Sequence, residues 1–205
     1  MNLKEKFTDL CLTISKDQDL INSLWQEIEK KYSEKGRYYH DLFHLENMFL
    51  ELETAQGHLQ DPVSVSFSVF YHDIIYDATS KSNEEKSAWC AVERLQKLDL
   101  NSEMISKISS QILATKSHQL SDESDTNYLL DTDLSILGKD LAVYLDYTRK
   151  IRKEYAIYPD LLYKPGRRKV LRHFLELESI FKTREFINLY EQQARQNITA
   201  ELQLL

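Results

Sequence analysis

Histidine and aspartate side chains form two short clusters within apolar surroundings. His40 and His44 are four residues apart and therefore share one face of a helix. The doublet His72-Asp73 ends the apolar run 63–71. A buried carboxylate needs a partner charge or a metal ion, and imidazole with carboxylate suits Zn, Fe, Mn, Co or Ni better than Mg alone. A single histidine in such a run is more often a hydrogen-bonded core residue, but the combined clusters indicate a divalent-metal site.

The order of these residues resembles the HD superfamily of metal-dependent phosphohydrolases, in which a histidine, a His-Asp doublet and a distant aspartate lie on helices. More narrowly, the chain resembles a bacterial family of predicted HD phosphohydrolases that has no settled substrate. The segments that carry the resemblance are 37–40 with His44, 71–73, 83–85, 131–138, 152–155 and 194–197. The resemblance implies one all-α, HD-type helical bundle over residues 1–205, with a core of about 20–203 and about eight to nine helices.

The resemblance also implies a set of metal ligands: His44, His72, Asp73 and Asp133. Asp133 is preferred because an Asp-Leu pair closes the last motif of the superfamily. Asp131, two residues earlier, is the alternate ligand and is also a candidate catalytic residue. The implied cofactor is a divalent metal, namely Mn, Fe, Co, Ni, Zn or Mg.

In this interpretation, His40 and Glu84 are the residues that transfer protons during the reaction. The segment 39–44 is similar to the Tyr-His…His arrangement of cyclic-nucleotide phosphodiesterases, where the first histidine donates a proton and the second binds metal. His40 is therefore expected to be a general acid or to support the ligands. Other HD hydrolases have an acid shortly after the doublet, so Glu84 or Glu85 is expected to orient the attacking water. The alternative is that both acids favour the start of a helix.

Four cationic side chains are candidates for binding a substrate phosphate: Arg37, Lys116, Arg152 and Arg168. Arg37 is equally well interpreted as an anchor of its own loop. The segment 149–172 contains nine Lys or Arg and two acids, which is typical of a solvated helix face or of an anion site.

Two further histidines, His118 and His173, are given different interpretations. His118 is a candidate ligand for a second metal or for phosphate, or else a partner of a helix dipole. His173 follows Arg172 on a helical pattern and is interpreted as structural.

The preferred function is hydrolysis of a nucleotide or another small phosphorylated metabolite. One alternative is a non-catalytic module that binds a nucleotide and signals to a partner. Another is an HD-type di-iron oxygenase, which would need further ligands from His40, His118 or Asp131. The net charge of −7 argues against binding to a nucleic-acid polymer. A monomer or a homodimer is expected.

The composition favours the helices that must position these side chains. Only four Gly and three Pro interrupt 205 residues, which favours an all-α protein. No apolar run approaches the roughly 20 residues of a membrane span, and the first residues lack the apolar region of a signal peptide. Cys11 and Cys90 are interpreted as free core thiols in a reducing compartment, so a cytoplasmic location without membrane contact is expected.

The apolar run before the doublet is the least certain element. Asp61-Pro62 is typical of a helix start, with an aspartate N-cap followed by proline. The residues 63–69 alternate with period two and are rich in β-branched side chains, which is typical of a strand. A helix is nevertheless expected, because a lone strand would have no partner and the resemblance implies a buried helix here.

Overall fold

The computed structural model describes residues 1–55 and 57–205, and these residues form helices and no strand. The elements are α1 (Leu3–Leu12), α2 (Gln18–Tyr32), α3 (Leu42–Ala55), α4 (Pro62–Tyr71), α5 (Asn83–Lys97), α6 (Ser102–Ala114), α7 (Ser124–Leu134), η1 (Ser135–Gly138), α8 (Leu141–Glu154), α9 (Asp160–Glu176), α10 (Arg184–Phe186), η2 (Ile187–Glu191) and α11 (Gln192–Leu204). The prediction of an all-α bundle is confirmed. Because η1 continues α7, and α10, η2 and α11 also follow one another without a break, the described residues form ten helical rods rather than eight or nine.

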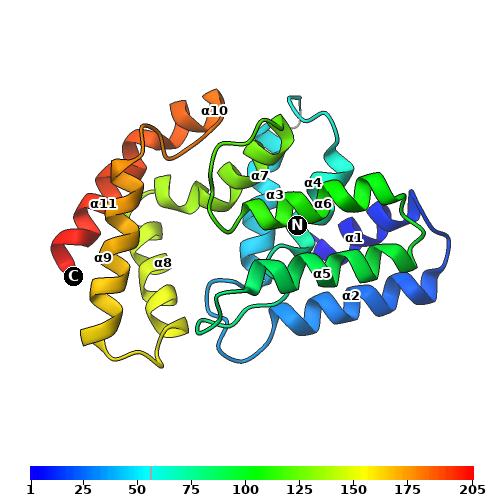
Figure 1. The fold of residues 1–205 in the computed structure, drawn as a ribbon, viewed down its shortest axis with the longest axis horizontal. Coiled ribbons are helices and arrows are strands. Elements are labelled where there is room, and N and C mark those ends of the chain that lie inside the picture. The colour runs from blue at the N-terminus through cyan, green and yellow to red at the C-terminus, as the bar shows by residue number, and fades with distance from the viewer. Residues whose placement is uncertain (56) are drawn as a thin grey trace.

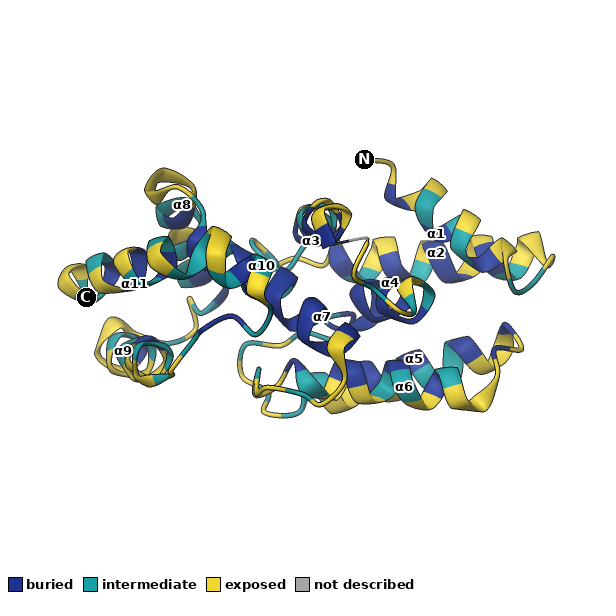
Figure 2. Ribbon diagram, turned by 90° about the horizontal axis from the view of Figure 1, so that it is seen from above, coloured by how far each residue is buried: buried dark blue, intermediate teal, exposed yellow. Residues whose placement is uncertain are grey.

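The helices form two groups that meet at α7. Figure 1 shows α1, α2, α5 and α6 on one side of α7, and α8, α9 and α11 on the other. Viewed from above, α5 and α6 run side by side, and α9 lies on the opposite side of α7 (Figure 2). The buried residues on α3, α4 and α7 gather at the centre of this arrangement. This central group carries the candidate metal ligands.

Aromatic side chains fill the core of the first group. The ring of Phe7 on α1 meets the ring of Phe70 on α4 edge-on, with centroids 5.0 Å apart, and the Trp25 ring of α2 lies 6.1 Å from that of Phe7. All three are almost completely buried, and burial of one such side chain stabilises the fold by about 1.5–3 kcal/mol. This packing fixes α4 in the interior, so the residues at its C-terminal end are fixed as well.

The second group is fastened to α7 by side chains of α11. The Asn197 amide donates hydrogen bonds to the carbonyl oxygens of Leu137 and Lys139, at 2.9 and 2.7 Å. These two bonds hold the backbone on both sides of Gly138, which ends η1. The Arg195 guanidinium donates to three carbonyl oxygens in the last turn of α9 and just beyond it. Arg195 and Asn197 therefore hold α11 to the rest of the fold.

Helix α4 forms over the run whose alternation is typical of a strand, so the prediction of a helix is confirmed. Asp61 caps the helix by accepting a hydrogen bond from the Ser64 N–H at 3.0 Å, and Pro62 occupies its first turn. Seven of its ten residues are buried. A helix that is buried on nearly all sides needs no polar face, so a period-two pattern does not indicate a strand here.

Both cysteines are free and buried, as predicted, and burial raises the pKa of the Cys11 thiol to about 12. None of the helices in the described part of the chain is both long enough and apolar enough to cross a bilayer.

Candidate functional site

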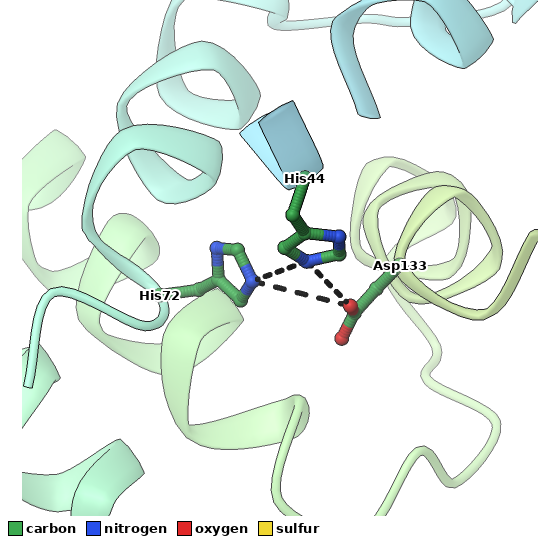
Figure 3. A group of neighbouring side chains, drawn as sticks. All are labelled: His44, His72 and Asp133. Atoms are coloured by element: carbon green, nitrogen blue, oxygen red, sulfur yellow. Dashed lines mark hydrogen bonds and ion pairs between the residues drawn. The ribbon is translucent and has the colours of Figure 1, made fainter. Parts of the chain in front are cut away.

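Three helices bring two imidazoles and a carboxylate to one point. His44 comes from the first turn of α3, His72 follows the last residue of α4, and Asp133 lies near the end of α7. The His44 Nε2 lies 3.3 Å from the His72 Nε2 and 3.2 Å from the Asp133 Oδ1. The His72 Nε2 lies 3.9 Å from the same oxygen. Figure 3 shows the three side chains converging from separate segments, and we call them the ligand triad.

The distances between the three ligand atoms of the triad are close to those between neighbouring ligands of one metal ion. Ligands about 2.1 Å from a common ion lie about 3.0–3.4 Å apart in octahedral or tetrahedral geometry. Two of the three distances fall in this range and the third is slightly longer. All three donor atoms lie within 4.8 Å of one another. The residues present therefore fit a divalent ion with two nitrogen ligands and one oxygen ligand.

The backbone of α4 fixes the tautomer of His72. Its Nδ1 lies 2.9 Å from the carbonyl oxygen of Val69, which can only accept a hydrogen bond. The Nδ1 therefore carries a proton, and in the neutral ring the Nε2 lone pair faces the other two ligands. A histidine that binds metal usually has its second nitrogen held in this way. His72 is also 1% exposed, so no water competes with this orientation.

Asp73 lies beside the triad. Its Oδ2 is 3.2 Å from the His72 Nε2 and 4.0 Å from the His40 Nε2. This proximity keeps it available as the fourth ligand that the sequence predicts, although the tight cluster of three does not contain it.

The electrostatics of the cluster favour a bound cation. Burial lowers the pKa of the His72 imidazole, but the carboxylates of Asp73 and Asp133 outweigh burial and raise it to about 9. Burial raises the pKa of the Asp133 carboxyl, yet hydrogen bonds from His118 and His44 hold that pKa well below its usual range. Positive charge is therefore stabilised at this point, and a divalent ion would supply it in place of a proton.

His118 contacts the oxygen of Asp133 that faces away from His44 and His72. Its Nε2 lies 2.9 Å from the Asp133 Oδ2, while the Oδ1 faces His44 and His72. The residue has a φ of 49°, in the left-handed region that side chains other than glycine rarely adopt. His118 thus orients a ligand, which differs from its predicted role as a ligand itself.

The position of Asp131 contradicts its candidate role in catalysis or metal binding. Its side chain is fully buried and accepts hydrogen bonds from the backbone N–H groups of Lys182 and Thr183 at 2.8 and 2.7 Å, and from the Thr183 hydroxyl. These contacts occupy both carboxylate oxygens. Asp131 fastens the segment before α10, whereas Asp133, two residues further along the same helix, faces the two histidines.

Glu154, at the end of α8, is the residue of the site that sequence reasoning missed. Its Oε1 accepts hydrogen bonds from three successive backbone N–H groups, those of Tyr38, Tyr39 and His40, at 2.7–3.0 Å. Its Oε2 lies 2.7 Å from the His40 Nδ1 and accepts a hydrogen bond from the Tyr76 hydroxyl at 2.9 Å. Burial raises its pKa, but these donors outweigh burial and lower it to about 2. Glu154 therefore holds both the loop and the ring of His40.

Arg37 is an anchor of the same loop, so its candidate role in phosphate binding is not supported. Its guanidinium donates hydrogen bonds to the carbonyl oxygens of His40, Asp73 and Ile74 at 2.7–3.0 Å. The Arg37 side chain lies across the rings of Tyr32 and Tyr76. It ties the His40 loop to the segment that follows the doublet, and few of its donors remain for a substrate.

Arg152 and Arg168 do not line the site, which corrects their predicted roles. The Arg152 guanidinium is bound to the Asp160 carboxylate at 2.8 Å and to the carbonyl oxygens of Tyr155 and Tyr158. It closes the turn between α8 and α9. Arg168, on α9, is absent from the walls of the cavity described next.

A cavity of about 960 Å³ opens beside the triad, and we call it the main groove. His40, Asp73 and Asp133 line one part of it, and residues of α9 line another. Glu84 and Lys116 also line the groove. Lys116 is bound to the Glu85 carboxylate and to the Lys81 carbonyl oxygen, whereas Glu84 makes no side-chain hydrogen bond within residues 1–55 and 57–205. Both predicted residues therefore border the space where a substrate would lie.

Comparisons of the chain with family models, with curated proteins and with solved structures return no match.

Proposed function

We propose that the chain is an HD-type, metal-dependent phosphohydrolase that acts on a nucleotide or another small phosphorylated metabolite. The observation that carries the proposal is the ligand triad of His44, His72 and Asp133, of which Asp133 borders an open groove. A structural metal site is closed by protein ligands, whereas a catalytic site keeps open positions. Here three ligands, or four with Asp73, leave such positions free on the groove side.

A divalent ion held by these side chains would supply Lewis-acid activation of a phosphoester and of water. The protein residues then have separate tasks. Asp133 and His72 are ligands whose orientations are fixed by His118 and by the Val69 carbonyl oxygen. Asp73 contributes negative charge beside them. Because hydrogen bonds already hold the orientations of Asp133 and His72, these ligands need little reorganisation when the site is used.

His40 is the proton donor in this proposal. Its Nδ1 faces Glu154 and its Nε2 faces Asp73 at the groove. The Glu154 carboxylate raises the pKa of His40 against the opposing effect of burial, which favours the protonated ring that donates to a leaving oxygen. A positioned acid of this kind contributes about 10²–10⁴-fold to a rate. Glu84 borders the groove with a free carboxylate and is the candidate that orients the attacking water.

Lys116 is the only predicted phosphate-binding residue that both lines the groove and retains the role proposed for it. Its ammonium is shared with Glu85, so a phosphoester would compete with that carboxylate. An exposed ion pair of this type contributes about 0–1 kcal/mol and is readily exchanged.

The test is phosphate release from a panel of nucleotides and sugar phosphates, with Mn, Co, Ni and Mg added back to metal-free protein. Wild type is compared with His72→Ala and with His58→Ala, a matched variant of an exposed histidine whose Nε2 lies 3.7 Å from the Glu185 Oε1. The proposal predicts metal-dependent turnover that is lost in His72→Ala and kept in His58→Ala.

Other outcomes select the alternatives. Tight nucleotide binding without turnover would indicate a non-catalytic nucleotide-binding module. Oxygen consumption with two irons per chain would indicate a di-iron oxygenase. Turnover that His72→Ala retains would exclude the triad as its origin.

A further inference from the structure

The main groove is far larger than a phosphate group. Its volume of about 960 Å³ lies at the upper end of the range of about 300–1,000 Å³ that is typical of pockets for drug-sized ligands. Of the ligand triad, Asp133 lines the groove, with Asp73 and His40, and α9 supplies a separate stretch of wall formed by Gly166, Lys169, Val170 and His173. Figure 1 shows α9 and the α5–α6 pair on opposite sides of α7. A substrate that contacts both Asp133 and the α9 wall must therefore extend across the groove.

The two stretches of groove wall differ in charge. The wall outside α9 carries the carboxylates of Asp73, Glu84 and Asp133, and its Lys116 is already paired with Glu85. On the α9 wall, Lys169 and His173 are one turn apart and both line the groove. Among the cations of α9, Arg167 is paired with Glu201, whereas Lys169 forms no ion pair with the residues that the structure describes. An unpaired cation in a groove of an acidic chain favours an anionic ligand.

The α9 wall also offers apolar surface beside its charged residues. Val170 is 47% exposed and Leu162 is 61% exposed, and both line the groove together with the ring of Tyr158. Apolar side chains that remain this accessible within a groove suit the carbon skeleton or a flat ring of a ligand.

Resting on the proposed function, we infer that the substrate is a doubly anionic phosphoester. One phosphate meets the metal ligands, a second phosphate or a carboxylate meets Lys169 and His173, and the organic part lies on Val170. The sequence-based interpretation of His173 as structural is thereby replaced, because this side chain is exposed on the groove wall. The α9 wall then selects substrates by length and by charge at the far end.

The test is calorimetric binding of alkane bisphosphonates of increasing chain length, each compared with the alkyl monophosphonate of equal length. Hydrogen bonds to charged groups contribute more than neutral ones, so one bisphosphonate length should bind about tenfold more tightly than its monophosphonate. Lys169→Ala should abolish this preference and leave monophosphonate binding unchanged. Arg172→Ala is the matched control, because it removes a neighbouring cation of α9 that does not line the groove, and it should keep the preference.

The outcomes separate this inference from the proposed function. Equal binding of the two ligand series, or a preference that Lys169→Ala retains, would overturn the inference even if phosphoesters are hydrolysed. A preference that depends on Lys169 in a protein without turnover would support the anion subsite and contradict the hydrolase.

Discussion

The Glu154 Oε2 lies 2.7 Å from the His40 Nδ1, although 114 residues separate them in the chain. The other carboxylate oxygen binds the backbone of the loop that carries His40. One side chain of α8 therefore sets both the position of the loop and the orientation of the ring. Because α8 belongs to the second group of helices, this contact also joins that group to the ligand triad.

Glu154→Gln should lower kcat by about 10²-fold with little change in KM. The glutamine oxygen can still accept the backbone hydrogen bonds, but its amide would donate to the His40 Nδ1 and reverse the tautomer. Steady-state kinetics of phosphate release measure kcat and KM separately. Glu51→Gln is the control, because Glu51 is a buried glutamate bound to Lys139 and Tyr190 outside the groove. An equal loss of kcat in both variants would contradict the positioning role.

Glu154 should also contribute to stability in acid. Its pKa is about 2 in the folded chain, against about 4.3 for a glutamate in an unfolded chain. A lowered folded pKa gives stability that is fully present above pH 4.3 and is lost as the pH falls toward 2. Urea unfolding between pH 6 and pH 2 should therefore show a smaller acid loss for Glu154→Gln than for wild type. Identical pH profiles would show that the buried carboxylate contributes nothing.

Asp131 and Asp133 should give opposite results when each is changed to asparagine. Asp131→Asn replaces one of the two oxygens that accept from the Lys182 and Thr183 N–H groups with an NH2 donor. It should destabilise the fold by about 1–3 kcal/mol while metal binding is kept. Asp133→Asn should lose metal binding at a smaller cost in stability. Thermal unfolding and metal analysis of the two purified variants provide the comparison, and loss of metal in Asp131→Asn alone would reverse the assignment.

Gly138→Ala should destabilise the fold. A Cβ atom added at Gly138 would lie 2.4–2.9 Å from the Cβ, the carbonyl oxygen and the Cα of Tyr190, and overpacking of this kind costs about 1–3 kcal/mol. Gly166→Ala on α9 is the matched control, because nothing lies within 4 Å of its Cβ position. That variant should raise stability by about 0.5–1 kcal/mol, since alanine favours a helix over glycine. Chemical denaturation measures both, and equal shifts would contradict the close contact.

Much of the fold follows from local rules that the sequence displays. The cap at Asp61, the rarity of glycine and the apolar stripes predict helices, and His44 and His72 follow from histidines placed in apolar runs. The alternation in 63–69 is the exception, because a helix buried on nearly all sides carries no periodic polar face. Local patterns therefore predict the elements and the inner ligands.

The supporting contacts could not be predicted, because they join residues far apart in the chain. Arg37 and Arg152 are ordinary cations in the sequence, and only the fold shows that backbone carbonyl oxygens take up their donors. Asp131 and Asp133 have the same kind of sequence neighbours. They differ in their contacts, which are backbone N–H groups for Asp131 and histidines for Asp133. The sequence held one indication of the role of Glu154. This acid lies on the same buried face of α8 as Tyr144 and Ile151, and a buried acid needs a partner.

Metal analysis of protein purified without chelator tests the central claim most directly. The ligand triad predicts stoichiometric divalent metal in wild type and in His58→Ala, and none in His72→Ala or Asp133→Asn. Circular dichroism of each variant confirms that its helices are retained. Folded His72→Ala protein that holds as much metal as wild type would contradict the metal centre, and with it the proposed hydrolase.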